Sequence, residues 1–304
     1  MALSPMPLKI PPIALPLGAS LLFAGSFIAG KYTTADLLPL TTSLWRYLVA
    51  LLFLTVMAWR LPGLSLTVAR RDLLPLSLLG LSGIVGYHYF FFSSLRYTAV
   101  INTAIINATN PIITSIAAAL ILGETLAFKN YLGGAIAFLG VILLLTGGNL
   151  QNLITLQFNQ GDALMLLAVF CWVAYSLLLK RLSRRYSGFT LTYYAALFGV
   201  IFLLLLAAPE HPIEQLRTSA IASQLGILYM GIGASGLGYL QYNLSVIAIG
   251  ATRTACIIYS FVPIFVALLS LLFFGAAIAP LMLLIMALII AGVNLMLAPT
   301  SPQT

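Results

Sequence analysis

Residues 110–124 read NPIITSIAAALILGE, and residues 262–276 read VPIFVALLSLLFFGA. Both stretches carry a proline at their second position, Pro111 and Pro263, and a glycine twelve residues after it. Most of the residues between these marks are apolar, as in a segment that faces lipid or a buried core. The offset between the copies is 152 residues, half of the 304-residue chain. The sequence therefore indicates a duplicated apolar unit.

The same offset joins a second pair of stretches, GYHYFFFSSLRYTA at 86–99 and GYLQYNLSVIAIGA at 238–251. Tyr87 and Tyr239 occupy matching positions after the leading glycine, whereas His88 has no histidine counterpart. Nearer the N-terminus, an offset of 149 residues places Phe23, Ser26 and Lys31 on Trp172, Tyr175 and Lys180. Because the offset changes by only three residues along the chain, we infer a tandem duplication of nearly the whole sequence.

The composition is not that of a water-soluble protein. The chain is 62% hydrophobic and 7% charged, with a mean hydropathy of +1.09, whereas soluble proteins average about 25% charged residues. So few polar side chains cannot cover a soluble core, and the solvent must be lipid. The two cysteines, Cys171 and Cys256, lie in apolar runs and are interpreted as small buried hydrophobes.

Ten runs are long and apolar enough to cross a bilayer, which takes about 20 residues per helix. The expected spans are residues 13–31, 39–59, 73–95, 99–121, 130–147, 162–180, 189–208, 224–247, 252–273 and 279–297. They form a first repeat, 13–147, a polar linker, 148–161, and a second repeat, 162–297. Because five spans per repeat is an odd number, the copies must insert in opposite orientations, as in many secondary transporters. The predicted fold is an all-α integral membrane protein of two inverted five-helix repeats.

Positive charge is distributed unequally between the two sides of this predicted topology. If the N-terminus is inside, ten cations flank inner span ends and three flank outer ends. The inner ones are Lys9, Arg60, Arg70, Arg71, Lys129, Lys180, Arg181, Arg184, Arg185 and Arg253, and the outer ones are Lys31, Arg96 and Arg217. Cytoplasmic loops carry such an excess, so we expect cytoplasmic termini and a plasma-membrane location. The net charge of +8 then reflects topology rather than a nucleic-acid site.

The longer blocks that contain the two prolines resemble the end of an EamA domain. They read PIITSIAAALILGETLAFKNYLGGAIAFLGVILL at 111–144 and VPIFVALLSLLFFGAAIAPLMLLIMALIIAGVNLML at 262–297. The WRYL at 45–48 and the aromatic residues of the first and sixth spans fit the same pattern. The resemblance covers residues 13–297. It implies a ten-helix member of the drug/metabolite transporter superfamily, which includes exporters of amino acids and other metabolites.

Two departures limit what this resemblance implies. Ala276 stands in the second copy where Glu124 stands in the first, so a mechanism that uses this acid symmetrically is not expected. The first span, LGASLLFAGSFIAGKY, has no carboxylate. The four-helix small multidrug-resistance relatives carry one in their first helix and exchange its proton for a cationic drug. We therefore do not favour a cationic-drug antiporter.

Arg46 is the one cation expected within a span. A lone arginine in hydrocarbon costs about 2.5–3.5 kcal/mol on insertion scales, so it should face a water-filled cavity or a partner. In a cavity its guanidinium would suit a substrate carboxylate, which it can bind through two parallel hydrogen bonds. The alternative is that Arg46, near the outer end of its helix, extends to the membrane surface.

Tyr87, His88 and Phe91 place aromatic and titratable groups within the third span. Tyr87 and Phe91 are one turn apart and share a helix face, so both are expected to line a cavity. His88 is rotated by about 100° from Tyr87. It is interpreted either as a packing residue or as a substrate contact or proton carrier, because the unperturbed pKa of imidazole is about 6.5.

The second repeat and the flanking spans supply the rest of the expected cavity. Tyr239 and Asn243 repeat the spacing of Tyr87 and Phe91. The full set of candidate substrate-binding residues is Arg46, Tyr87, His88, Phe91, Asn107, Trp172, Tyr175, Tyr239, Tyr242, Asn243 and Tyr259. The alternative for the tyrosines is an aromatic belt at the membrane surface, although Trp172 lies deep in its expected span.

Pro111 and Pro263 are predicted to lie inside helices. An interior proline removes one backbone hydrogen bond and often kinks its helix. Each kink would serve packing, or act as a hinge for alternating access, or both.

These features predict a secondary transporter of small metabolites. They favour an exporter of amino acids, and among these the aromatic or apolar ones. An enzyme, an ATP-binding loop, a metal site and a cofactor are not indicated. The expected partners are a small-molecule substrate and the lipid bilayer, and the expected state is a monomer, with a dimer as the alternative. A carrier for other organic anions or drugs and a non-transporting receptor or scaffold are the alternative functions.

Overall fold

Helices are the only regular secondary structure in the part of the chain that the structure describes. This computed structural model describes residues 11, 13–61, 63–94, 97–98, 106–123, 127–146, 151–154, 159–274 and 280–298. Lys9, Arg96, Glu124, Ala276 and half of the expected linker, 148–161, lie outside the described residues, as does the side chain of Lys31.

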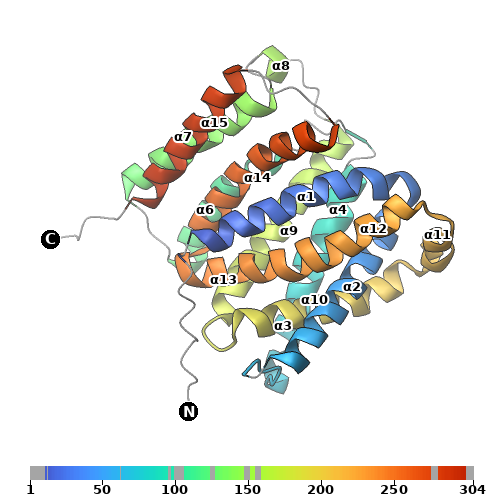
Figure 1. Ribbon diagram of the computed structural model, residues 1–304. Helices are drawn as coiled ribbons and strands as arrows, with labels where there is room; N and C mark the ends of the chain where they lie inside the picture. The colour runs from blue at the N-terminus through green and yellow to red at the C-terminus, as the bar shows by residue number, and fades with distance from the viewer. Residues whose placement is uncertain are drawn as a thin grey trace.

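The helices follow one another in a similar order in the two halves (Figure 1). The first half contains α1 (Ala14–Asp36), α2 (Pro39–Arg60), η1 (Arg70–Asp72), α3 (Leu73–Leu79), η2 (Gly80–Gly86), α4 (Tyr87–Ser94), α6 (Asn110–Leu122) and α7 (Phe128–Leu145). After α8 (Gln151–Ile154), the second half contains α9 (Gln160–Leu182), α10 (Gly188–Leu206), η3 (Ala208–Glu210), α11 (Pro212–Thr218), α12 (Ile221–Tyr229), η4 (Met230–Gly238), α13 (Tyr239–Ile249), α14 (Ala251–Phe274) and α15 (Pro280–Leu297). The segments η2 and η4 are π-helical, so their hydrogen bonds span five residues instead of four.

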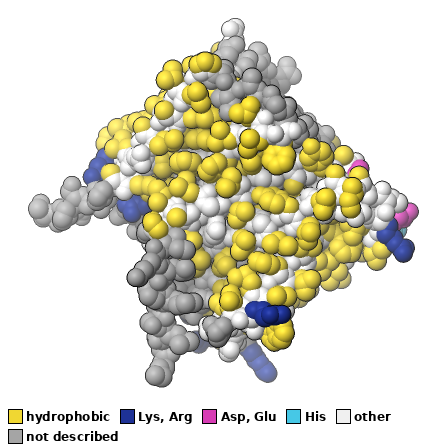
Figure 2. Space-filling model, viewed as in Figure 1, with side chains coloured by type: hydrophobic (Ala, Val, Ile, Leu, Met, Phe, Trp, Pro, Cys, Tyr) yellow, Lys and Arg dark blue, Asp and Glu magenta, His cyan; other side chains and the backbone are white. Residues whose placement is uncertain are grey.

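Eight helices in the described part of the chain are long and apolar enough to cross a membrane. Two of them are composite, because α3, η2 and α4 run on as one helix, and α12, η4 and α13 as another. The other two predicted spans correspond to the shorter apolar helices α6 and α7, and residues 99–105 lie outside the described part. Hydrophobic side chains cover most of the face in Figure 2, with lysine and arginine near its margins. Ten spans therefore stay a prediction, whereas an all-helical membrane protein is confirmed.

The helices of the two halves interdigitate. α1 packs against α14 and the α12–η4–α13 helix, and its counterpart α9 packs against α6 and the α3–η2–α4 helix. In the same way α2 lies along η4, and α10 lies along η2. Figure 1 shows α7 and α15 side by side at one edge of the molecule. Because many partners of each half come from the other half, the main buried core forms between the two halves.

Glycines let the backbones of α7 and α15 touch directly. A Cβ atom added to Gly292 would lie 2.5 Å from the backbone nitrogen of Ala137, and one added to Gly133 would lie 2.3 Å from that of Met296. The hydrophobic effect does not drive helices together within lipid. Close van der Waals contact at small residues therefore holds such pairs together.

The two prolines occupy different places in their helices. Pro263 lies inside α14, as predicted. Pro111 instead falls in the first turn of α6, after a turn at Ala108 and Thr109. The missing N–H of a proline costs nothing in a first turn, because that donor has no intrahelical acceptor. The prediction of an interior proline is therefore wrong for Pro111, and its hinge role stays a prediction.

We expect Gly133→Val to lower the free energy of unfolding by roughly 1–3 kcal/mol, as overpacking does, because the added carbons must displace α15. Thermal unfolding of the purified protein in detergent micelles measures this loss. Gly134→Val is the matched control, since a Cβ atom there would lie 3.4 Å from the flexible side chain of Met296. Equal losses in the two variants would contradict the direct α7–α15 contact.

Candidate functional site

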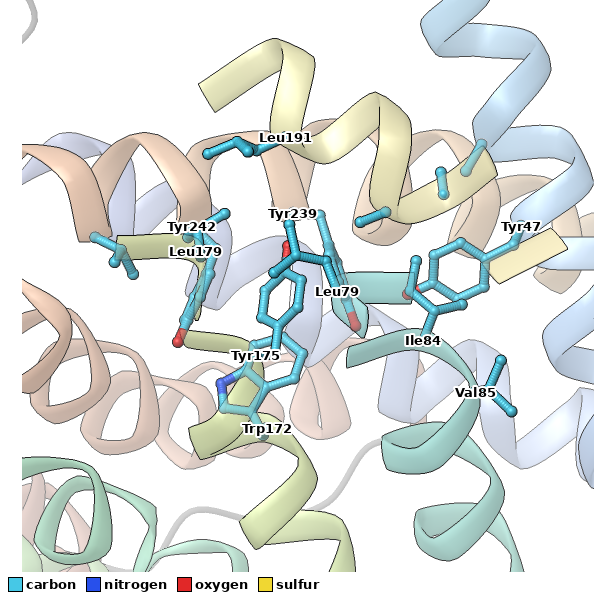
Figure 3. Close-up of a cluster of buried hydrophobic side chains, with 14 of the residues drawn as sticks. Tyr47, Leu79, Ile84, Val85, Trp172, Tyr175, Leu179, Leu191, Tyr239 and Tyr242 are labelled. Carbon is cyan, nitrogen blue, oxygen red and sulfur yellow. The ribbon is translucent and has the colours of Figure 1, made fainter. Parts of the chain in front are cut away.

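An aromatic cluster occupies the interior between the two halves. Trp172 of α9 lies in its middle, with its ring centroid 4.8 Å from those of Tyr87 and Tyr242, 5.3 Å from Tyr239 and 5.4 Å from Tyr175. Figure 3 shows Trp172, Tyr175, Tyr239 and Tyr242 grouped together. We term these five residues the aromatic centre. All but the half-buried Tyr87 are buried.

Further rings extend the aromatic centre toward α1 and α2. Phe91 stacks on Tyr87 with a centroid distance of 5.8 Å and an interplanar angle of 6°, and it meets the edge of Phe27 from α1. His88 lies 5.0 Å from Tyr87 and 5.2 Å from Tyr47 of α2. Aromatic rings from five helices thus meet in one region, and such rings can contact an apolar or aromatic part of a ligand.

The π-helical segment η2 places its backbone in direct contact with the aromatic centre. A Cβ atom on Gly83 of η2 would lie 2.3 Å from the ring of Tyr175, so only glycine lets this ring rest on the helix. The carbonyl of Gly83 accepts a hydrogen bond of 2.9 Å from the Tyr239 hydroxyl. Ser235 of η4 matches Gly83 at the 152-residue offset. Short π-helical insertions are frequent at functional sites, and here each half contributes one.

Arg46 connects the two halves beside the aromatic centre. Its Nε donates a 2.9 Å hydrogen bond to the Ser235 hydroxyl, and its guanidinium lies 5.4 Å from the centroid of Tyr47. The side chain is only 4% exposed, so it does not extend to the membrane surface. Within the described residues the one ion pair joins Arg185 to Asp72, and no acid pairs with Arg46.

His88 is held by a backbone hydrogen bond. Its Nδ1 lies 2.9 Å from the carbonyl of Ile84, one turn earlier, and a carbonyl can only accept, so Nδ1 carries the proton. The ring is 3% exposed and packs against Tyr47, Tyr87, Phe92 and Tyr239. This environment favours the packing interpretation of His88.

Asn243 belongs to a buried hydrogen-bond chain that joins three helices. The Tyr175 hydroxyl donates to Asn243 Oδ1 at 2.8 Å, and Asn243 Nδ2 donates to the Thr192 hydroxyl at 2.7 Å. Thr192 in turn donates to the Gly188 carbonyl. The Tyr242 hydroxyl is likewise paired, with Ser176. These hydrogen bonds tie α9, α10 and α13 together.

Asn107 and Tyr259 also lie next to the aromatic centre. The Asn107 side chain lies beside the Tyr87 hydroxyl, and Tyr259 belongs to the same buried cluster as Trp172 and Tyr242. Asn107 Oδ1 and Asn110 Nδ2 are buried and have no hydrogen-bond partner in the described part of the chain. Buried polar groups are seldom left unpaired, so these two atoms are available to a ligand or to water.

The structure brings all eleven predicted residues to one region, and their role in binding is taken up below. Three residues of this region were missed. Tyr47 follows Arg46 in the quoted WRYL, Phe23 matches Trp172 in the repeat, and Ser235 matches Gly83. The repeat alignment already placed Phe23 opposite Trp172, and extending it to Gly83 would have pointed to Ser235. Three or more histidine, cysteine or acidic side chains do not gather at any one place among the described residues, so no metal site is built there.

The EamA-like transporter family model matches the chain twice, over residues 10–146 and 159–298. The chain belongs to the EamA-like transporter family. Two family domains therefore follow one another, as the repeated blocks predict. With its apolar helices, the protein is a multi-pass membrane transporter of this family.

Named relatives and a solved structure agree with this assignment. An uncharacterized transporter of Bacillus subtilis, YyaM, is 29% identical over 84% of this chain and 83% of its own. A protein of Streptantibioticus cattleyicolor, named a probable terminal-alkyne amino-acid exporter, is 27% identical over 74% of this chain and 73% of its own. A crystal structure covers 93% of this chain and 95% of its own with a TM-score of 0.75 at 19% identity, which supports the fold alone.

We expect Asn243→Leu to destabilise the protein by roughly 1–3 kcal/mol, because it leaves the buried hydroxyls of Tyr175 and Thr192 without this partner. Thermal unfolding in micelles measures the change. Gln241→Leu on the same helix is the control, since Gln241 Oε1 has no partner to lose. A larger loss for the Gln241 variant would refute the structural role of Asn243.

Proposed function

We propose that this transporter is a secondary carrier that binds a small carboxylate-bearing metabolite beside the aromatic centre and exports it, with amino acids as the preferred class. The observation that carries the proposal is Arg46, a buried guanidinium that joins the two halves and has no acidic partner among the described residues.

An anionic ligand would compensate the charge of Arg46. A buried charge is stable only when it is paired and hydrogen-bonded, and Ser235 supplies a single neutral acceptor. Thr42 lies one turn before Arg46, and its buried hydroxyl has no partner in the described part of the chain. This set of donors suits a carboxylate, which accepts several hydrogen bonds at once.

The rest of the site favours a ligand that also has an apolar part. The rings of the aromatic centre offer flat apolar surfaces, and the faces of tryptophan and tyrosine attract an ammonium group by cation–π interaction. An amino acid with an apolar or aromatic side chain combines these features. The relative named as an amino-acid exporter supports the same class.

We further propose ten spans in two inverted repeats, with both termini in the cytoplasm and the protein in the plasma membrane. The described charges support this topology. Nine cations lie at the ends assigned to the inside, and Arg217 lies at the outside together with four of the five described acids. Such an imbalance fits the excess of lysine and arginine in cytoplasmic loops.

Polar contacts between the halves close the end of the molecule that we assign to the outside. The Asp36 carboxylate, at the end of α1, accepts hydrogen bonds from the Ser223 hydroxyl at 2.6 Å and the Ala220 amide at 3.0 Å. The Glu210 carboxylate accepts from the Thr41 amide at 2.7 Å. The hairpin of α1 and α2 is thereby fixed to the α10–α12 connection of the other half.

A related contact closes the opposite end. Asp72, before α3, pairs with Arg185 at 2.7 Å and accepts from the Tyr186 hydroxyl at 2.6 Å. Here the loop between α9 and α10 meets the loop between α2 and α3. In the proposed cycle the two halves rock about the aromatic centre, with Pro111 and Pro263 as the proposed hinges. This motion would break the contacts at one end of the molecule while the contacts at the other end hold. A substrate or ion gradient, rather than ATP, would drive the cycle.

Arg46→Gln tests this function. We expect counterflow of the best amino acid from a labelled panel, measured in proteoliposomes, to fall by about 10–100-fold, since a charge-assisted hydrogen bond contributes ~1.5–3 kcal/mol. The melting temperature of the purified variant shows whether it still folds.

Arg60→Gln is the control for Arg46→Gln, because Arg60 stacks on the exposed Trp59 at the end of α2. We expect it to transport at the wild-type rate. Equal transport by the Arg46 and Arg60 variants would contradict the carboxylate role. A panel that includes organic anions without an amino group separates an amino-acid carrier from a general anion carrier, and absence of flux for every compound would favour a receptor or scaffold.

His88→Gln tests proton coupling. We expect the variant to transport more slowly but to keep the pH dependence of wild-type transport. The buried His88 ring donates to the Ile84 carbonyl and has almost no contact with water, so it should not carry the coupling proton. Initial rates between pH 5.5 and 8 measure the profile, a range that brackets the unperturbed imidazole pKa of about 6.5. Loss of the pH dependence would instead assign the coupling proton to His88.

A further inference from the structure

A hollow lies on the outside of the π-helical segment η2, apart from the aromatic centre. It has a volume of about 810 Å³. Its lining includes Leu78, Ser82, Gly86 and Phe90 along the α3–η2–α4 helix, with Cys171 and Ala174 of α9 opposite them. We term this hollow the lateral groove. None of its lining residues belongs to the aromatic centre.

The lateral groove offers almost nothing to a polar ligand. Its lining is nearly all carbon and sulfur surface. The Ser82 hydroxyl, which lies in the wall, already donates to the Leu78 carbonyl at 2.7 Å. Water is held in a cavity only by two to four polar partners, so the groove calls for an apolar occupant.

The groove opens toward the bilayer. Leu78 and Leu81 are each 43% exposed, and Leu206, at the end of α10, is 48% exposed. In a membrane protein such side chains face lipid tails. From Leu78 to Phe90 the helix rises by roughly 18 Å at about 1.5 Å per residue. This length is close to the hydrocarbon depth of one leaflet, which is half of about 30 Å.

We propose that the lateral groove binds one acyl chain of a bilayer lipid, from the leaflet at which α2 begins and α10 ends. The length of the groove, its apolar lining and its opening toward lipid match a hydrocarbon chain held parallel to the helices. Lipids exchange freely at a convex protein surface. A hollow of this volume instead gives one acyl chain van der Waals contacts on several sides, which would hold it there.

A chain in this groove would press on the wall of the aromatic centre. Val85 and Gly86 form part of the groove, and a Cβ atom on Gly86 would lie 2.9 Å from Cys171 Sγ, so the wall is closely packed. Figure 3 shows Val85 away from Trp172 and Tyr239. On the inner side of the same segment, Gly83 accepts the hydrogen bond from Tyr239. The lipid site and the aromatic centre thus share η2.

Photo-crosslinking of the wild-type protein tests the proposal. The probe is phosphatidylcholine with a diazirine on one acyl chain, present at low fraction in phosphatidylcholine–phosphatidylglycerol vesicles. After irradiation, mass spectrometry maps the adducts along the chain. We expect adducts on the groove residues to exceed those on the lipid-facing side of α7 by about tenfold, which corresponds to ~1.4 kcal/mol of preference for the groove over bulk lipid.

Ala174→Phe fills the groove, and Ala135→Phe, at an exposed position of α7, is its matched control. We expect the first variant to lose the groove adducts and the second to keep them. Uniform labelling of all lipid-facing helices in the wild type would overturn the proposal. Adducts that survive Ala174→Phe would overturn it as well.

Discussion

Hydrocarbon contains no hydrogen-bond partners, and every polar group of this chain inside the bilayer must find one within the protein. Helices satisfy the backbone. Most side-chain hydroxyls bond to a backbone carbonyl of their own helix, as when Ser20 donates to the carbonyl of Pro16 one turn earlier. What then holds the helices together is close contact at glycines and a small number of polar links, among them the buried Tyr175–Asn243–Thr192 chain.

Arg46 departs from this rule, and the proposed function rests on it. The other described cations lie near the ends of helices, where lipid headgroups or water can solvate them. Arg46 is buried where the two halves meet and bonds to a serine instead of an acid. Arg46 has no counterpart in the other half of the site, because no other described arginine or lysine lies beside the aromatic centre. The duplicated fold builds a symmetric frame, and the unduplicated Arg46 would give it selectivity.

Most of the fold and of the candidate site follows from the sequence, because membrane helices leave a strong apolar signal and duplication aligns the halves. The repeat identified Tyr87 and Tyr239 as equivalent, and the rings of both meet Trp172. What sequence could not supply were the details of hydrogen bonding. The sequence placed Asn243 in the candidate site, but it did not show that Asn243 bonds to Tyr175 and Thr192 from two neighbouring helices. No residue pattern predicts a π-helical segment either, because its hydrogen-bond register depends on tertiary packing.

The central claim is that the carboxylate of the transported molecule meets Arg46. The most direct measurement compares the affinity of the purified protein for its best amino acid with that for the same amino acid as its amide, which keeps the shape and removes the charge. Isothermal titration should show binding of the amide weakened by at least about tenfold, or ~1.4 kcal/mol. Equal affinity for the two compounds would contradict the account.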